Sequence, residues 1–376
     1  MLTRLLSNDF PRSRVLAIIL LLIFAALALT PFLIPGVKAL NVAAKVLVFV
    51  VLVASFDLLL GYTGIVSFAH TMFFGIGAYG VAIASTRMGP GWSALAVGIV
   101  CALALSFVLA LAIGLFSLRV RAIFFSMITL AFAAAFQTLA SQLSEFTGGE
   151  DGLTFKMPEV LSPGFEFELL GRTFDGRLVC YYLLFVAAVV LFLAMLRIVN
   201  SPFGRVLQAI RENEFRAEAI GYRVVVYRTV SSILSALFAT LAGAMLAIWL
   251  RYNGPDTTLS FEIMLDVLLI VVIGGMGTIY GAAIGSGLFL VAQSYLQDLL
   301  KLASEAVSGL PWLAALLSPD RWLLWLGLLF VLSVYYFPTG VVGRLRAMQP
   351  PPRTPSRPPA APAASSNAIK GDYVEN

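Results

Sequence analysis

Charged side chains are scarce in this sequence. Only 12% of the 376 residues are Asp, Glu, Lys or Arg, and 60% are hydrophobic. A soluble globular domain carries about 25% charged residues. Two stretches have no charge at all, 27 residues from Trp92 to Leu118 and 23 residues from Ala122 to Ser144. Because a helix needs about 20 such residues to cross a bilayer, we predict an all-α, polytopic membrane protein.

Histidine and cysteine are also scarce, and a nucleotide-binding motif is absent. His70 is the only histidine, so no zinc site is predicted. Cys101 and Cys180 both lie in apolar runs, and we interpret them as buried core thiols. No G-x-x-x-x-G-K-[ST] motif is present to bind nucleotide phosphates. We therefore expect no enzyme activity, no metal and no cofactor. The net charge of +5 is attributed to basic cytoplasmic loops, not to nucleic-acid binding.

Apolar runs divide the chain into about ten predicted spans. The first run follows a basic segment, as in a signal peptide, but it is longer than the usual apolar region of about 7–15 residues. We interpret it as a retained transmembrane helix. The predicted spans cover residues 15–35, 39–60, 65–86, 92–117, 121–143, 178–200, 225–250, 259–275, 281–300 and 321–341.

The distribution of charge in the loops predicts the orientation in the cell inner membrane. The loop 144–177 holds seven acidic and three basic residues and is assigned to the outer side. The loop 201–228 holds five arginines and is assigned to the cytoplasm. The basic N-terminus, 1–14, and the Pro/Ala-rich tail, 346–376, are also assigned to the cytoplasm, and the tail is predicted to be disordered. An even number of spans in the transmembrane domain, 15–345, satisfies these assignments.

Glycines interrupt two parts of the predicted bundle, within residues 61–77 and 274–287. Gly-interrupted spans in two halves of a transporter indicate a binding site, since irregular backbone in a membrane must line a cavity or be buried in protein. The alternative is close helix packing through small residues. For His70, a packing role and a functional role both stay open. The residues predicted to line a translocation path are Gly64, Ser67, His70, Phe73, Gly75, Gly77, Thr129, Gly274, Gly275 and Gly277.

Four further ionisable residues lie within the predicted spans. Glu262 and Asp266 are four residues apart and share one helical face. Such a pair leaves an ion-coupled secondary transporter as an alternative. Lys45 and Asp57 are twelve residues apart, about 18 Å along a helix, which is too far for a direct ion pair.

The loop 201–228 predicts a short amphipathic helix outside the membrane. Ser201 is suited to cap it, with Pro202 in its first position. Leu207 and Ile210 belong to an apolar stripe, and Gly221 is placed to end the helix. Helices that lie on lipid favour basic residues without matching acids. Three glutamates among the arginines therefore favour a protein partner.

Four stretches of the chain resemble one family of transport proteins. GRVLQAIRENEFRAEAIGY, within the loop 201–228, is similar to the EAA-type coupling segment of ABC importer permeases. The stretches 61–79, 147–153 and 271–285 are similar, in the same order, to signatures of the branched-chain amino-acid permease family. Together they cover about residues 15–345, and the TGG motif of the outer loop favours the LivM-type subunit.

The resemblance implies a function, a fold and a set of partners. It implies a type II-like ABC importer fold and the import of branched-chain amino acids, with urea or short amides as an alternative substrate. The implied partners are a second, LivH-like permease subunit, two ATPase subunits that bind the ATP, and a periplasmic binding protein. The chain departs from the family pattern at Asp57, Ala69 and Ala134, which leaves the substrate open.

The resemblance also assigns roles to two sets of residues. Arg211 and Glu212 are expected to touch the ATPase groove. The residues expected to couple to the ATPase are Gly204, Arg205, Gln208, Ala209, Ile210, Arg211, Glu212, Asn213, Ala217 and Gly221. The residues expected to meet the binding protein are Thr147, Gly148, Gly149 and Asp151.

Overall fold

The computed structural model describes most of the predicted transmembrane domain. The predicted N-terminal segment and tail lie outside the described residues, apart from the few positions that adjoin a helix, and both remain predictions. The described residues are 14–34, 36–117, 122–169, 172–307, 316–336 and 339–347.

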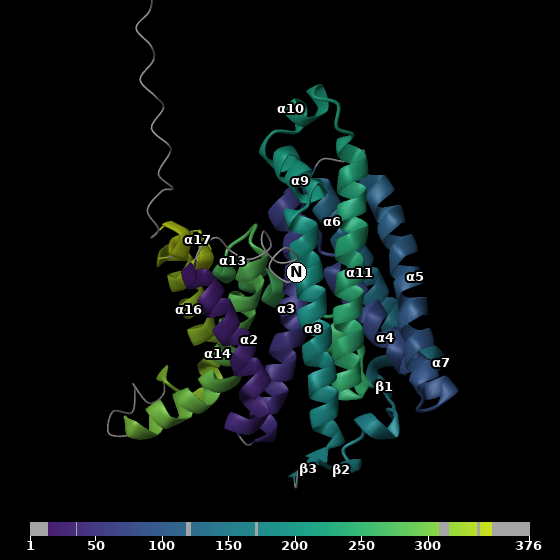
Figure 1. Ribbon diagram of the computed structural model, residues 1–376, viewed down its shortest axis with the longest axis vertical. Helices are drawn as coiled ribbons and strands as arrows, with labels where there is room; N and C mark the ends of the chain where they lie inside the picture. Colours follow the sequence, from purple (N-terminus) through teal and green to yellow (C-terminus); the bar gives the residue numbers. More distant parts are fainter. Residues whose placement is uncertain are drawn as a thin grey trace, which may run out of the picture.

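The described chain is a bundle of long helices with short elements at both ends (Figure 1). The long helices are α2 (Arg14–Leu33), α3 (Val37–Thr63), α4 (His70–Met88), α5 (Trp92–Ser117), α6 (Ala122–Gln142), α8 (Gly176–Asn200), α11 (Val224–Leu250), α13 (Phe261–Gly274), α14 (Ile279–Ala306) and α16 (Trp322–Tyr336). The short helices are α7 (Ser144–Thr147), α9 (Pro202–Glu212), α10 (Glu214–Ala219), α12 (Pro255–Thr258) and α17 (Gly340–Ala347), with 3-10 turns η1 (Gly149–Asp151), η2 (Glu159–Leu161) and η3 (Pro319–Arg321).

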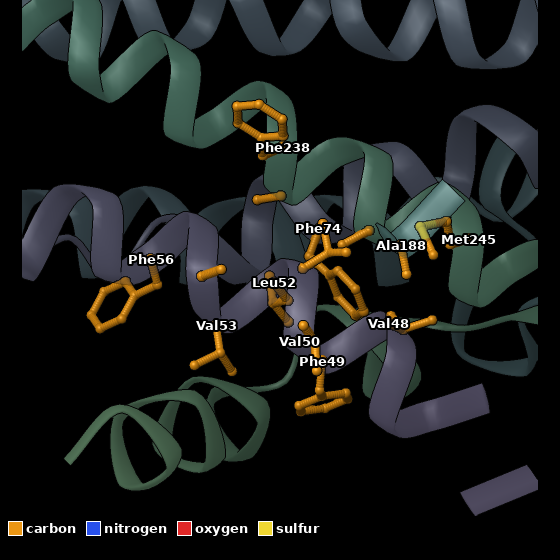
Figure 2. Packing of buried hydrophobic residues seen from close by; sticks show 14 of the residues in the cluster. Val48, Phe49, Val50, Leu52, Val53, Phe56, Phe74, Ala188, Phe238 and Met245 are labelled. Carbon is orange, nitrogen blue, oxygen red and sulfur yellow. The ribbon is translucent and has the colours of Figure 1, made fainter. Parts of the chain in front are cut away.

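Helix α3 is the centre of the bundle. It contacts α2, α8, α11, α13 and α14. Its residues 46–59 are all buried, as expected of a helix that is apolar on every side. Figure 2 shows side chains of α3 packed among residues of α4, α8 and α11; those labelled are Val48, Phe49, Val50, Leu52, Val53, Phe56, Phe74, Ala188, Phe238 and Met245.

The third predicted span differs most from the structure. Nine stretches of the described residues are helical, long and apolar enough to cross a membrane, against about ten predicted. The stretch that is missing is 65–86, because α4 begins only at His70 and its C-terminal turn carries Arg87. The expectation of a helix from residue 65 was wrong. Helix α4 is instead a mostly buried helix between α5 and α11.

The eighth predicted span ends at a break in the helix, and the tenth is composed of shorter pieces. The eighth contains α13, which has 14 residues and is therefore about 21 Å long, with α12 in front of it. Residues 275–278 then leave the helix before α14 begins at Ile279. The tenth is built from η3, α16 and α17. The span predicted over 259–275 is thus confirmed as α13, and the single helix predicted over 321–341 is corrected.

Two small β-ribbons accompany the helices, and the predicted all-α class is confirmed. Strand β1 (Leu153–Thr154) pairs antiparallel with β4 (Tyr252–Asn253). Strand β2 (Glu166–Leu169) pairs antiparallel with β3 (Arg172–Asp175). These ribbons lie at the lower end of the bundle in Figure 1, and α9 and α10 lie at the upper end. We call these the β-ribbon end and the α9 end.

The two cysteines have different environments. Cys180 of α8 is fully buried, as expected for a core thiol, but Cys101 is exposed. The interpretation of Cys101 as a core residue was wrong because an apolar run does not show which of its faces packs against protein. Only 28% of the most apolar window of α5 is buried within this chain.

Candidate translocation and coupling site

The break between α13 and α14 packs directly against α3. A Cβ atom added to Gly61 would lie 2.5 Å from the amide nitrogen of Gly277 and 2.6 Å from its Cα atom. Gly277 has φ +78°, a conformation that residues with a side chain rarely adopt. Asp57 and Arg211 flank this contact. We call Asp57, Gly61, Arg211 and Gly277 the glycine junction.

Hydrogen bonds connect three elements at the glycine junction. The Gly277 N–H donates to Asp57 Oδ1 at 2.8 Å. Arg211 Nη1, which comes from the last turn of α9, donates to the carbonyl oxygen of Gly61. A Cβ atom on Gly277 would lie 2.9 Å from Arg211 Nη1. Arg211 therefore connects α9 directly to α3 and to the break between α13 and α14.

Residues near the C-terminus of the described chain enclose the other side of this break. Gly275 has φ +112°, and a Cβ atom on it would lie 3.0 Å from the carbonyl oxygen of Thr339. A Cβ atom on Gly274 would overlap the carbonyl of Gly281. The Thr278 hydroxyl donates to the Gly275 carbonyl oxygen at 2.7 Å. Gly275 and Thr278 of the break are thus buried in protein, whereas Met276 is 50% exposed.

The irregular segment between α3 and α4 is held by side chains of α6. Gly64 ends α3 in the left-handed conformation, with φ +74°. The Phe68 N–H donates to Thr129 Oγ1 at 3.0 Å. The Ser126 hydroxyl donates to the Val66 carbonyl oxygen at 2.9 Å. Thr129, predicted to line a translocation path, is fully buried and stabilises this turn.

His70 is a buried connection between α3, α4 and α11. Its Nε2 lies 2.7 Å from the Ser235 hydroxyl, which donates to the Ser55 carbonyl oxygen at 2.5 Å. Its Nδ1 lies 3.4 Å from the Ser67 carbonyl oxygen. The ring of Phe56 packs edge-on against the imidazole, with ring centroids 4.9 Å apart. Between the two roles left open for His70, this geometry favours packing. Ser67 and Phe73 are also buried, at 4% and 3% exposure.

The glycines inside α4 are points of close helix packing. A Cβ atom on Gly77 would overlap the carbonyl of Thr240 in α11, and one on Gly243 would overlap the carbonyl of Phe74 in α4. The two helices thus approach backbone to backbone at two places. A Cβ atom on Gly75 would overlap the side chain of Leu259. The alternative of close helix packing therefore describes Gly75 and Gly77.

The loop at the α9 end contains two helices where one was predicted. Ser201 Oγ caps α9 by accepting from the Gly204 N–H at 3.4 Å, with Pro202 in the first turn. Asn213 interrupts the helix because its backbone is extended and its side chain accepts from the Arg216 N–H at 2.9 Å, which starts α10. The predicted cap is confirmed, and the single predicted helix is corrected.

The two faces of this loop differ sharply. Ile210 and Ala217 are 1% and 2% exposed and pack toward α11. Phe215 is 85% exposed and Ile220 is 67% exposed. Sequence reasoning missed Phe215, although an aromatic residue within a charged stretch outside the membrane is a usable signal. Among the residues predicted to couple to the ATPase, those with exposed side chains are Arg205, Gln208, Ala209, Arg211, Glu212 and Asn213.

A salt bridge attaches α10 to the bundle. Arg228 donates through both terminal nitrogens to Glu214, at 2.7 and 3.0 Å. Bidentate geometry makes this pair more rigid than most surface ion pairs. The loop is thus held against the bundle at two places. The Arg228–Glu214 pair holds α10, and the buried face of α9 holds the other part.

The TGG motif at the β-ribbon end forms a tight turn. The Thr147 hydroxyl donates to the Ala140 carbonyl oxygen at 2.5 Å, and the Gly149 N–H approaches Thr147 Oγ1 at 3.3 Å. Gly148 and Gly149 both have positive φ, +76° and +64°. Thr147 and Gly149 are buried, whereas Asp151 is exposed. Of the four predicted contact residues, Asp151 has the most accessible side chain, and the others shape the turn.

A polytopic helical bundle with two interrupted helix pairs and an amphipathic loop at one end is typical of membrane transport proteins. A family model described as "Branched-chain amino acid transport system / permease component" matches residues 38–334. Because this match covers well over half of the chain, the chain belongs to that family.

Curated relatives agree with this assignment. The chain is 26% identical over 287 residues to the high-affinity branched-chain amino acid transport system permease protein LivM of Escherichia coli K12, a match that covers 72% of this chain and 66% of the relative. The corresponding protein of Salmonella typhimurium gives the same values. A probable LivM of Methanocaldococcus jannaschii is 25% identical over 265 residues, covering 69% of this chain and 72% of the relative.

Proposed function

We propose that this chain is the membrane-spanning permease subunit of an ATP-driven ABC importer for branched-chain or related amino acids. A periplasmic binding protein would deliver the amino acid at the β-ribbon end. Two ATPase subunits would bind ATP and dock at the α9 end, and a LivH-like permease would complete the pathway. The proposed orientation places the α9 end and both termini in the cytoplasm, with the chain in the inner membrane.

The observation that carries this proposal is the arrangement of the α9–α10 loop. One face of the loop is buried against α3, α8 and α11, and the opposite face exposes Phe215 and Ile220. Arg211 reaches from the loop to the carbonyl of Gly61. Exposed apolar side chains outside the membrane favour a protein partner. A partner that moves this loop would move the glycine junction.

Uptake by the assembled transporter tests the proposal. The chain would be co-expressed with its candidate partner subunits, reconstituted in vesicles, and supplied with radiolabelled leucine and the binding protein. We expect uptake that requires ATP and persists when the proton gradient is collapsed. Uptake that stops with the proton gradient while ATP is held constant would contradict the proposal and favour an ion-coupled transporter. If urea or a short amide competed with leucine, the substrate would be assigned to that class of compound instead.

Docking of the ATPase is tested separately with Phe215→Asp. A buried aromatic anchor at an interface is worth about 2 kcal/mol or more, so we expect the ATPase to be lost on co-purification while the permease stays folded. A control in α11, such as Val225→Asp, is avoided because it would place a charge in a membrane-spanning helix. Glu218→Gln, an exposed change on the same short helix, provides the control and should retain the ATPase.

A further inference from the structure

A polar cavity lies inside this chain, away from the glycine junction. Its volume is about 450 Å³, within the range of small-molecule sites. Lys45 is on the first half of α3, which runs from Val37 toward the glycine junction, so the cavity lies in the half nearer the β-ribbon end. No residue predicted for the translocation path is among its lining residues, which come from α3, α4, α11, α13, α14 and the segment before α13.

The cavity contains both signs of charge without an internal ion pair. The described residues that line it include one cation, Lys45, and three carboxylates, Asp256, Glu262 and Asp266. Among the described residues, neither Lys45 nor Asp266 forms a salt bridge within 4.0 Å. Lys45 Nζ lies 5.5 Å from the centroid of the Phe49 ring, and Asp266 Oδ2 accepts from Gln293 Nε2 at 3.4 Å. A cation and carboxylates that share a cavity but not a bond suit a ligand that carries both charges.

Part of the remaining wall of the cavity is apolar, and the rest is polar, with Asn41, Thr257, Ser260 and Gln293. Aromatic rings of Phe49, Phe74 and Trp249 line it together with Leu246 and Ile263. Sites for small molecules commonly combine such walls with a few polar groups that fix orientation. An apolar side chain attached to a charged head group would therefore find a matching surface.

A second cavity leads from the first toward the β-ribbon end. It has a volume of about 230 Å³ and shares Asn41, Trp249 and Leu250 with the first. It adds Arg177 and Arg251, which lie where α8 begins and where α11 ends. Two guanidinium groups attract a carboxylate to this position. The charges thus form a sequence, with arginines nearest the end of the bundle and Lys45 and Asp266 deeper.

We propose that the larger cavity binds a zwitterionic α-amino acid with an apolar side chain. The carboxylate faces Lys45, the ammonium faces Asp266 and Glu262, and the side chain lies against the aromatic wall. The arginine-lined cavity is its entrance. This proposal rests on the proposed function and adds to it a substrate site within this single chain.

Binding of radiolabelled L-leucine to the full chain in lipid nanodiscs tests the proposal, with Lys45→Met and Asp266→Asn as the variants. Each variant removes one charged hydrogen-bond partner, so we expect leucine to bind about tenfold more weakly or worse. Lys38→Met is the matched control, because Lys38 is on the same helix and pairs with Asp298 at an exposed position. A surface pair contributes little, so this control should bind within about twofold of the original chain.

Two leucine analogues test the need for both charges. Leucine amide lacks the carboxylate and 4-methylpentanoate lacks the ammonium, so neither should compete with leucine. If Lys45→Met and Asp266→Asn fail to fold, Glu262→Gln decides, because Glu262 is exposed at the cavity and its replacement should weaken leucine binding without unfolding the chain.

The outcomes separate this proposal from the proposed function. Unchanged leucine binding in the folded cavity variants, or no saturable binding by the original chain, overturns the cavity proposal even if ATP-driven uptake is observed. Conversely, weakened binding in the variants supports the site even if the reconstituted transporter imports leucine without ATP, a result that would overturn only the proposed function.

Discussion

Glycines in two regions of the bundle have different roles. Gly77 and Gly243 lie inside regular helices and let α4 and α11 approach backbone to backbone. Gly277 lies outside any helix, at φ +78°, where α3, α9 and the break meet. The first region packs two helices of the bundle together, and the second joins the loop 201–228 to the interrupted helices. A glycine cluster therefore has no single meaning in a membrane protein.

The largest effect should come from filling the helix-packing region. Gly77→Val would place side-chain atoms into the Thr240 carbonyl, and overpacking of this kind costs about 1–3 kcal/mol or more. We expect the purified chain to lose most of its thermal stability and to aggregate on size-exclusion chromatography. Gly287→Ala is the control, because a Cβ atom there meets nothing within 4 Å. A Gly77→Val chain as stable as that control would contradict the packing role.

A smaller loss of stability, with a larger loss of function, is expected at the glycine junction. Gly277→Ala forces a side chain onto a left-handed backbone, at about 1–2 kcal/mol, and displaces Arg211 from Gly61. We expect a folded chain in which ATP-driven uptake falls about tenfold. The measurement is leucine uptake normalised to folded protein. If uptake and stability fell in equal proportion, the two glycine regions would not differ in role.

The smallest effect should come from Asp57, and its size should depend on which residue replaces the aspartate. Asp57→Asn keeps the oxygen that accepts from the Gly277 N–H, so stability and uptake should stay close to those of the original chain. Asp57→Leu leaves that N–H without a partner, which costs about 1–3 kcal/mol. Thermal unfolding of both variants measures the difference. Equal stability of the two would show that the hydrogen bond to Gly277 contributes nothing.

Much of the bundle could be predicted because apolar length and loop charge are local properties. The cap at Ser201, the stripe containing Ile210 and the presence of spans all follow from nearby residues. The start of α4 at His70 could not be predicted, because the segment before it is held by Thr129 and Ser126 of α6. The split at Asn213 was missed because an Asn side chain within a charged helix does not by itself reveal a cap.

The candidate site was less predictable, since it depends on contacts between distant segments. Gly61 and Gly277 each belong to a recognisable motif, but their packing against each other is a property of the fold. Lys45 and Asp266 were noted as costly charges within spans, yet their common cavity depends on how α3, α13 and α14 pack. Family membership required the ordered combination of motifs, because each motif alone is ambiguous.

Arg211→Glu in the complete transporter is the most direct test of coupling between α9 and the broken helices. Arg223→Glu, an exposed charge reversal in the same loop but outside the residues expected to couple to the ATPase, is the matched control. ATPase co-purification, ATP hydrolysis and leucine uptake would be measured on one preparation. We predict that the Arg211→Glu complex assembles and hydrolyses ATP while uptake falls at least about tenfold, and that the control imports leucine. Normal uptake by Arg211→Glu would contradict coupling through the glycine junction.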